Sequence, residues 1–263
     1  QEGRKAWQWD RQFSFNRENG LSSNLVASLY ADREGTIWIG TRSGGLNRLK
    51  NDRVSVFNTT EGLSHTYVSS VFKDSEGNLW VGTNGGGLNL LRDSKIATYS
   101  TKNGLSYDQV YGIFQDSQEI IWVGTFGSGI NCIKDGQVYR RLTVEDGLPI
   151  NFFLSICQDA EGNMWFGTYG SGAVCMKDRN FKTYTTRDGL IDNFVYGLYR
   201  DRKGNLWAWT NQGGLHRFSR SSGRFTLNKR LKGKVRAFLE DSRGNLWVGT
   251  DKMGVIRIKG KEN

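Results

Sequence analysis

The sequence predicts an all-β protein, because one pattern of about 42 residues recurs along nearly the whole of its 263 residues. Each copy has a tryptophan inside a short apolar run, such as NLWVGT at 78–83, and an Asp- and Gly-containing turn before it. No segment has the hydrophobic periodicity of a helix. Spacings of 42, 42, 43, 42 and 40 residues separate Trp38, Trp80, Trp122, Trp165, Trp207 and Trp247.

Each repeat is predicted to form four short strands. In the unit around Trp80 the strands are Val68–Phe72, Leu79–Thr83, Leu88–Leu91 and Ile96–Tyr99, with polar turns between them. A single sheet of this size cannot bury both of its faces, so the units must stack. Four-stranded repeats of this length predict a β-propeller, in which blades surround a central channel.

The first strand of each unit has a small residue in its middle, as expected where the innermost strands crowd around an axis. These residues are Ser28, Ser70, Gly112, Ser155, Gly197 and Ala237.

Closure of the ring follows from counting strands. The last unit, Val235–Ile258, has only three predicted strands. Residues 9–16 resemble a fourth strand, because they stand before Gly20-Leu21 just as the fourth strands of other units stand before a Gly-Leu pair. We therefore predict that residues 1–263 form a single β-propeller domain of six four-stranded blades. The N-terminal strand completes the last blade and closes the ring.

Charge is unevenly distributed along the chain. The net charge is +10, yet residues 1–178 have 17 Lys and Arg against 19 Asp and Glu, whereas residues 179–263 have 19 against 7. The last third, at +12, is thus expected to produce a one-sided positive field. Cys132, Cys157 and Cys175 are too few and too widely spaced for a disulfide framework or a metal site, so we expect buried thiols.

Targeting signals are not evident in the sequence. The start, Gln1-Glu2-Gly3-Arg4, lacks the pattern of a signal peptide, and no apolar run is long enough to span a membrane. We expect a soluble, mature or trimmed segment that makes no membrane contact of its own.

The repeated motif resembles that of a known family. The run D-x-x-G-x-[LI]-W-[VI]-G-T, followed by G-G-L and by G-L-S in the crossover, resembles the two-component regulator propeller repeat. That family forms the extracytoplasmic sensor portion of bacterial hybrid histidine kinases and of some diguanylate cyclases. The resemblance implies a periplasmic ligand sensor, often for oligosaccharides. Members usually have two propellers, commonly seven-bladed, then a β-sandwich, a membrane helix and a kinase, so this chain is either an excised part or a shortened relative.

Strand order assigns the loops to two faces. The lower face carries the turns between the first and second and between the third and fourth strands. The upper face carries the remaining turns and the crossovers between units. Because the Asp-rich lower turns repeat almost unchanged, we expect them to stabilise the blade, with Asp side chains bonding their own turns. A binding site is expected where residues vary, and the predicted upper rim consists of Arg42, Asn84, Phe126, Tyr169, Asn211 and Asp251.

The crossovers add His65, Tyr67, Tyr107, Asp108, Asn151, Phe152, Asn193 and Phe194. Aromatic rings can cover the apolar faces of a sugar while Asn, Asp and Arg bond its hydroxyls. In the structural alternative, the aromatics pack between blades and Asn24, Asn151 and Asn193 cap their loops.

The fifth repeat deviates most. Trp209 replaces a glycine, and the crossover that follows, residues 229–236, is strongly basic. We predict that Trp209, Lys232 and Lys234 contribute to an acidic-glycan site, with charge-assisted hydrogen bonds to carboxylate or sulfate. The alternative is a solvated basic loop.

Catalytic chemistry has little support in the sequence. His65 and His216 are its two imidazoles, and no spacing suits zinc or another cofactor. We predict a non-catalytic periplasmic sensor domain with no cofactor and no nucleic-acid partner. Its partners would be a neutral or acidic oligosaccharide and neighbouring sensor domains or a dimer partner. The alternatives are a propeller lyase resembling streptogramin-type lyases, with His65 as base, and a protein-interaction platform.

Overall fold

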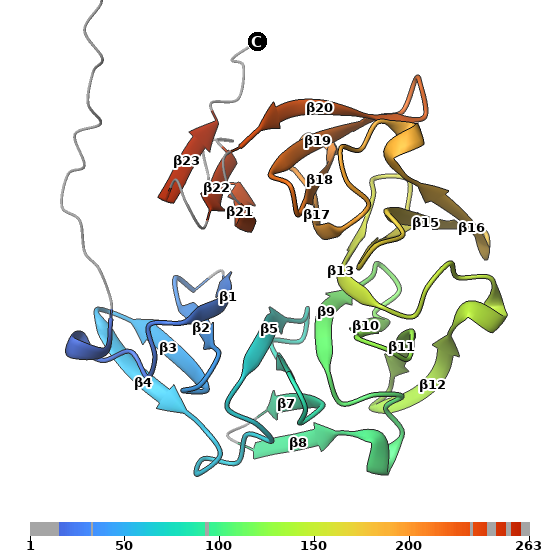
Figure 1. Cartoon of the computed structure of the whole chain (residues 1–263). Helices are drawn as coiled ribbons and strands as arrows, with labels where there is room; N and C mark the ends of the chain where they lie inside the picture. The colour runs from blue at the N-terminus through green and yellow to red at the C-terminus, as the bar shows by residue number, and fades with distance from the viewer. Residues whose placement is uncertain are drawn as a thin grey trace, which may run out of the picture.

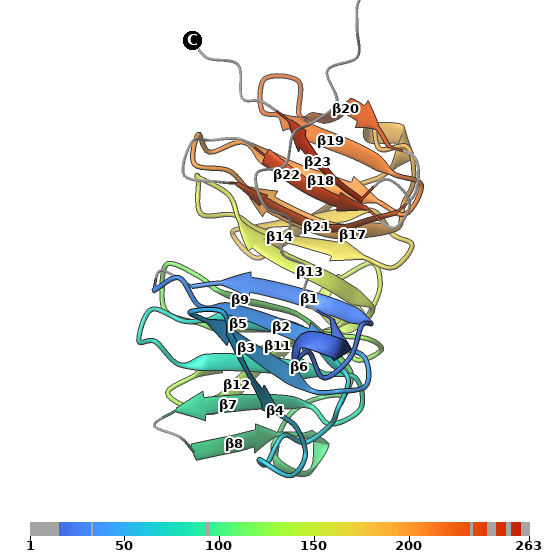
Figure 2. The ribbon, with the colours of Figure 1, turned by 90° about the vertical axis from the view of Figure 1, so that its left-hand side faces the viewer.

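The structure is a computed structural model that describes residues 16–32, 34–92, 95–231, 234–240, 246–250 and 254–258. Within these residues, 23 strands form six antiparallel sheets, each made of consecutive strands. The sheets are arranged in a ring with the first strand of each nearest the centre (Figure 1). From the side, the strands run between the two faces of the ring (Figure 2).

Blades one to three comprise β1 (Val26–Ala31), β2 (Ile37–Thr41), β3 (Leu46–Lys50), β4 (Arg53–Phe57), β5 (Val68–Lys73), β6 (Leu79–Thr83), β7 (Leu88–Arg92), β8 (Lys95–Tyr99), β9 (Val110–Gln115), β10 (Ile121–Thr125), β11 (Ile130–Lys134) and β12 (Gln137–Leu142). Blades four and five comprise β13 (Phe153–Gln158), β14 (Met164–Thr168), β15 (Ala173–Lys177), β16 (Asn180–Tyr184), β17 (Val195–Arg200), β18 (Leu206–Thr210), β19 (Gly214–Ser219) and β20 (Arg224–Arg230). The sixth sheet comprises β21 (Val235–Glu240), β22 (Leu246–Thr250) and β23 (Gly254–Ile258). The strands predicted around Trp80 are confirmed to within one residue at each end.

In the five four-stranded blades, hydrogen bonds join the repeated Asp and Trp at the lower face. In blade two, Asp74 Oδ1 accepts the N–H groups of Glu76 and Asn78 at 3.1 and 2.8 Å. Its Oδ2 accepts Trp80 Nε1 at 2.7 Å. The expectation that these aspartates bond their own turns is confirmed, and the bond to Trp explains why the two residues recur at a fixed spacing of six.

The core lies between blades. Trp122 of blade three packs against Phe166 of blade four, with ring centroids 5.9 Å apart. Phe153 and Ile130 complete this buried cluster. Cys132, Cys157 and Cys175 are buried thiols, as predicted. Because each blade uses its neighbour to cover an apolar face, the sheets are stable only as a stack.

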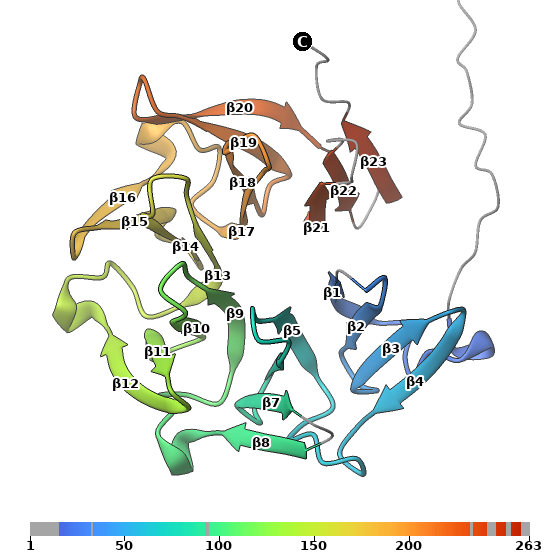
Figure 3. The same cartoon turned by 180° about the vertical axis from the view of Figure 1, so that it is seen from behind.

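The prediction of six four-stranded blades is wrong. The structure has five four-stranded blades, and the sheet of β21, β22 and β23 has three strands. That sheet lies between blades five and one from either side (Figures 1 and 3). No described strand completes it, and residues 9–15 of the proposed closing strand lie outside the described residues.

A capped turn accounts for the residues before Gly20-Leu21, from which ring closure was predicted. Asn16 caps the 3-10 turn η1 (Arg17–Asn19), which ends at Gly20 with φ of 115°. The same capped turn precedes blades three, four and five, as η2 (Thr101–Asn103), η3 (Val144–Asp146) and η4 (Thr186–Asp188). The spacing before Gly20 therefore encodes the capped turn of a crossover between blades.

Blade one is open on one side in the described structure. Val68 of blade two packs onto Gly40 of blade one, so the equivalent Val26 points away from blade two. Val26 is 43% exposed, whereas Val68 is fully buried. The side of blade one that faces the three-stranded sheet is thus less covered than the equivalent side of the other blades.

Candidate functional site

The residue directly after the second strand has the same backbone anchor in all five four-stranded blades. Its N–H donates to the carbonyl oxygen of the residue before the first strand of the same blade. These bonds run from Arg42 to Leu25, Asn84 to Tyr67, Phe126 to Gln109, Tyr169 to Phe152 and Asn211 to Phe194, at 2.9 to 3.1 Å. The backbone of the rim is therefore repeated, and its side chains provide the variation.

Glycine-rich turns fix this rim to the next blade. In blade two, the N–H groups of Gly85 and Gly87 donate to the carbonyl oxygen of Asp108, in the crossover to blade three, at 3.0 and 2.8 Å. Gly87 has φ of 79°, and a Cβ atom there would lie 2.1 Å from the carbonyl oxygen of Tyr99. Glycine is therefore required for this close approach.

Several aromatic rings meet on the upper face of blades three to five. Phe126 and Tyr169 are packed edge to face with centroids 5.3 Å apart. Phe152 lies 4.9 Å from Phe126, and Phe194 lies 4.9 Å from Tyr169. Tyr111 of β9 adds a ring 5.6 Å from Phe126. The structure thus brings together two predicted rim residues and two predicted crossover residues.

Tyr67 and Arg42 extend this group towards blade one. The Arg42 guanidinium lies over the Tyr67 ring, 5.9 Å from its centroid, and Tyr67 is an electrostatic neighbour of Tyr111. Burial, followed by the neighbouring Tyr67, raises the pKa of Tyr111. Its hydroxyl therefore stays protonated and can donate a hydrogen bond at neutral pH. We call Arg42, Tyr67, Tyr111, Phe126, Phe152, Tyr169 and Phe194 the mouth cluster.

Two tyrosines near the rim, one of them in the mouth cluster, were not predicted from the sequence. Tyr111 and Tyr196 occupy the extra position of a bulge in the first strand, where the pairing register shifts. Tyr196 also raises the pKa of Tyr111, so the two tyrosines are electrostatic neighbours. In the sequence, each tyrosine stands next to the small middle residue of its strand, and this was the signal available for finding it. The alternation of side chains along a strand does not reveal a bulge, so it could not show which way these rings point.

The two asparagines of the rim are partly buried, and within the described residues no side-chain contact joins them to the mouth cluster. Asn84 pairs through its backbone with Gln109. The Asn211 Oδ1 atom is buried and has no hydrogen-bond partner among the described residues. Asp251 lies outside the described residues.

The predicted residues around blade five are dispersed. Trp209 covers Gly197, and its ring stacks on Phe238 with centroids 5.3 Å apart and planes 16° apart. Trp209 therefore packs between blade five and the three-stranded sheet. Lys234 is partly buried just before β21, and Lys232 lies outside the described residues. The acidic-glycan site at these positions stays a prediction.

Polar crossover residues mostly have structural partners. Asn24, Asn151 and Asn193 accept the N–H groups of Arg17, Val144 and Thr186 at 2.8, 3.1 and 2.9 Å. The loop-capping alternative for these asparagines is confirmed. Asp108 has the same role, because its carboxylate accepts Thr101 N–H and Oγ1 at 2.7 and 2.9 Å.

Both histidines accept backbone hydrogen bonds. His65 Nδ1 accepts the N–H of Tyr67 at 3.0 Å. The buried His216 accepts the N–H of Ile191 through Nε2 at 3.1 Å, and burial lowers its pKa to about 4. The His216 ring is thus neutral in this arrangement at pH 7.

Among the described residues, no group of three or more His, Cys, Asp or Glu side chains is placed to hold a metal ion. No described helix is long and apolar enough to cross a membrane.

The chain belongs to the two-component regulator propeller family. The family model matches residues 20–43, 62–85, 104–127, 147–170, 189–212 and 231–252, which together exceed half of the chain. No curated protein matches the chain.

Solved structures of two extracellular domains are similar to this chain. The extracellular domain described as part of the hybrid two-component system BT3049 of B. thetaiotaomicron has 26% identity and a TM-score of 0.62, over 90% of this chain and 39% of that domain. The extracellular domain of BT4673 from the same organism has 19% identity and a TM-score of 0.74, over 91% and 36% of the two chains. The chain therefore spans under two fifths of the length of these domains.

A lyase has a similar fold. The virginiamycin B lyase of Staphylococcus aureus has 16% identity and a TM-score of 0.68, over 90% of this chain and 85% of the enzyme. At this identity the likeness concerns the fold alone.

Proposed function

We propose that this chain is an extracytoplasmic, non-catalytic ligand-sensing domain of a two-component-type receptor, and that it binds an oligosaccharide on its upper face. The observation that carries the proposal is the mouth cluster, which combines aromatic rings with phenol hydroxyls and a guanidinium on a propeller of this family. Tyr169 is 42% exposed, so one ring is available to a ligand. Carbohydrate sites use this mixture of flat apolar surface and directed polar groups.

The location follows from the related domains. Both B. thetaiotaomicron structures are extracellular domains of two-component systems. A sensor in that position must pass ligand binding to another domain or a dimer partner. The ligand can do so only if it has different affinities for two arrangements of the receptor.

The contacts of the histidines favour binding over catalysis. His65 Nδ1 accepts the backbone N–H of Tyr67, so the lone pair of this nitrogen is engaged and is not free to take a proton from a substrate. His216 is buried and likewise accepts a backbone N–H. The lyase alternative would require His65 to release its backbone partner.

Calorimetric titration of the whole chain with neutral and acidic oligosaccharides tests the upper-face site. Replacing Tyr169 and Asn84 together by Ala is expected to weaken binding about tenfold or more, since a ring contact and an amide hydrogen bond are lost. Tyr139 of β12, an exposed tyrosine in an outer strand, gives the matched control Tyr139→Ala, which should bind as the wild type does.

The thermal unfolding temperature of the double variant should stay close to that of the wild type. Unchanged affinity in the double variant would reject the upper-face site. Conversion of an added oligosaccharide or lactone by the pure chain would favour the lyase alternative instead.

A further inference from the structure

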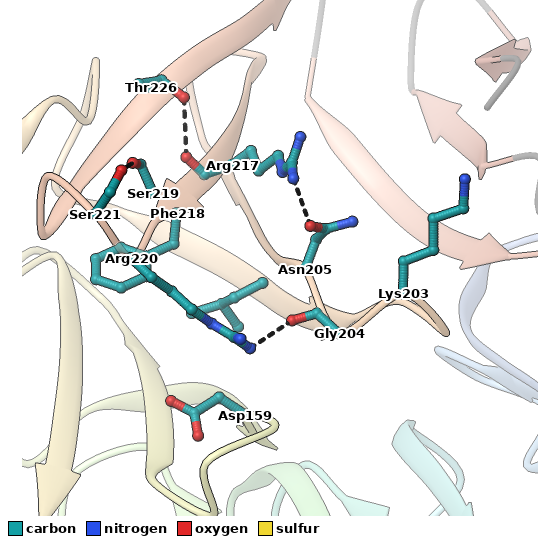
Figure 4. Close-up of a pocket in the computed structure, with 11 residues that line it drawn as sticks. Asp159, Lys203, Gly204, Asn205, Arg217, Phe218, Ser219, Arg220, Ser221 and Thr226 are labelled. Atoms are coloured by element: carbon teal, nitrogen blue, oxygen red, sulfur yellow. Dashed lines mark hydrogen bonds between the residues drawn. The ribbon is translucent and has the colours of Figure 1, made fainter. Parts of the chain in front are cut away.

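A pocket of about 490 Å³ opens at the lower-face turns of blade five (Figure 4). Its walls come from the turn between β17 and β18, from β19 and β20, and from the turn that joins them. Asp159 of blade four lies at its border, and Phe218 contributes an aromatic ring. The volume is in the range of small-ligand sites.

The turn between β19 and β20 is longer than its counterparts in other blades and forms part of the wall of this pocket. Four residues, 220–223, join β19 to β20. Two residues join the corresponding strands in blades one, three and four, namely 51–52, 135–136 and 178–179. The longer turn places Arg220 and Ser221 in the wall of the pocket.

The turn between β17 and β18 reverses the charge found in other blades. Lys203 stands where blades one, two and four have Glu34, Glu76 and Glu161. In blade one the glutamate pairs with Lys73 at 3.0 Å. Blade five therefore has a cation where other blades have a group that neutralises cations.

Arg217 and Lys203 provide the unpaired positive charge. Asn205 lies between the two side chains (Figure 4) and accepts one hydrogen bond from Arg217 Nη2 at 2.5 Å. Within the described residues, neither cation has a carboxylate partner. The other donors of the Arg217 guanidinium can therefore serve a planar or tetrahedral oxyanion.

The nearby carboxylates are already engaged. Asp159 accepts the N–H groups of Glu161 and Asn163 at 3.0 and 2.9 Å, and its second oxygen accepts Asn163 Nδ2 and Trp165 Nε1 at 2.9 and 2.7 Å. Glu161 pairs with Arg220 at 2.8 Å. Both carboxylates therefore already have partners within the protein, and among the described residues neither pairs with Lys203 or Arg217.

The uncharged side chains of the pocket indicate what else a bound anionic ligand would contain. Ser219 and Ser221 present hydroxyls 3.2 Å apart, which can donate to or accept from ligand hydroxyls. The Phe218 ring is fixed from behind by Trp165, with centroids 4.9 Å apart. A flat apolar surface beside hydroxyls and cations suits a sugar better than a bare ion.

We propose that this lower pocket binds an anionic sugar unit, whose carboxylate or sulfate ester lies against Lys203 and Arg217. The pocket shares no residue with the mouth cluster, so the inference is independent of the upper-face proposal. Its charged group can be a uronic carboxylate or a sulfate ester, because both accept the same hydrogen bonds from Arg and Lys.

The test is calorimetric titration of the whole chain at constant ionic strength with glucuronic acid, glucose 6-sulfate, inorganic sulfate and glucose. At least one anionic sugar is expected to bind about tenfold more tightly than both glucose and inorganic sulfate. Which of the two anionic sugars binds tighter identifies the charged group. Failure of both to bind, or binding of inorganic sulfate as tight as that of the sugars, would overturn the proposal.

Charge variants then locate the site. Lys203→Glu installs the residue that the same turn has in three other blades, so the fold is expected to tolerate it. Lys203→Glu and Arg217→Ala should each weaken binding of the preferred anionic sugar about tenfold. Lys134→Glu, at the exposed end of β11, makes the same change of net charge away from the pocket and should change affinity less than about twofold.

Equal losses in Lys203→Glu and Lys134→Glu would reduce the effect to long-range charge and reject the pocket. The double variant of Tyr169 and Asn84 should retain its affinity for the anionic sugar. Loss of that affinity in the upper-face variant, with none in Lys203→Glu, would place the anionic sugar at the mouth cluster and also reject the proposal.

Discussion

Blades four and five share one hydrogen-bonded framework but differ in the side chains and the turn around it. In both, an aspartate of the lower turn bonds the blade tryptophan, at 2.7 Å in blade four and 2.9 Å in blade five. The differences between blade five and blade four include three large substitutions and one longer turn. Lys203 replaces Glu161, Trp209 replaces Gly167, His216 replaces Val174, and the turn between its third and fourth strands is two residues longer.

The difference shows how a repeated blade can acquire new features without losing its fold. Each large substitution has a compensating neighbour. Trp209 fits because residue 197 on the adjacent strand is Gly, where blade four has Ser155. His216 fits because its Nε2 accepts the N–H of Ile191, as Asn131 accepts that of Ser106 in blade three. The hydrogen-bonded framework is constant, and variation occurs in pairs around it.

The largest expected effect comes from breaking the Trp209 pair. A Cβ atom on Gly197 would lie 1.8 Å from the Trp209 ring. Gly197→Ser should therefore lower the free energy of unfolding by about 3 kcal/mol through overpacking. Combining it with Trp209→Gly recreates the Ser and Gly pair of blade four. In urea unfolding, the double variant should lose at least about 2 kcal/mol less unfolding free energy than the sum of the losses of the two single variants. Additive losses would contradict the pairing.

The second prediction concerns pH and His216. The pKa of its buried imidazole is lowered to about 4, whereas in the unfolded chain it is near 6.5, so between these values the unfolded state binds the extra proton. This part of the stability is complete above about pH 6.5 and falls by up to about 1.4 kcal/mol per unit towards pH 4.

Urea unfolding across this range would measure the pH effect, and His216→Asn, which installs the asparagine of blades one to three, should flatten the curve. The same slope in His216→Asn would assign the pH dependence to other groups.

The third prediction tests whether the framework is equally strong in both blades. Asp159→Asn and Asp201→Asn each remove a buried carboxylate that bonds its own turn and a tryptophan. Each should cost about 2 kcal/mol of unfolding free energy, because charge-assisted hydrogen bonds are lost in a buried setting. Guanidinium unfolding should give values within about 0.5 kcal/mol of each other. A much smaller loss in blade five would mean that its framework has weakened.

The smallest effect is expected at the contact between the two blades. Arg220 and Glu161 form an ion pair whose side chains are 53% and 47% exposed. Arg220→Ala should change the free energy of unfolding by less than about 0.5 kcal/mol, because exposed pairs are screened by solvent. A larger loss, measured by thermal and urea unfolding, would show that this pair joins the blades.

The sequence predicted the repeated parts of the molecule more accurately than the parts that occur once. The strands around Trp80, the Asp-rich turns and the capping asparagines are encoded locally, by residues within a few positions of each other. The number of complete blades was predicted wrongly, since the sheet of β21, β22 and β23 has three strands, and residues 9–15 of the proposed closing strand lie outside the described residues. For the site, the rim positions Phe126 and Tyr169 could be chosen from their variation, but Tyr111 could not, because it depends on a bulge.

The sequence by itself determined the repeat, its strands and the turn chemistry, because hydrogen bonds over two to six residues depend only on local residue types. Tertiary structure decided which varied side chains meet. Tyr67, Tyr111, Phe126 and Tyr169 come from three blades and form one cluster only through the packing of those blades. The lower pocket likewise depends on the longer turn of blade five standing beside blade four, a relation between segments over forty residues apart that no local pattern encodes.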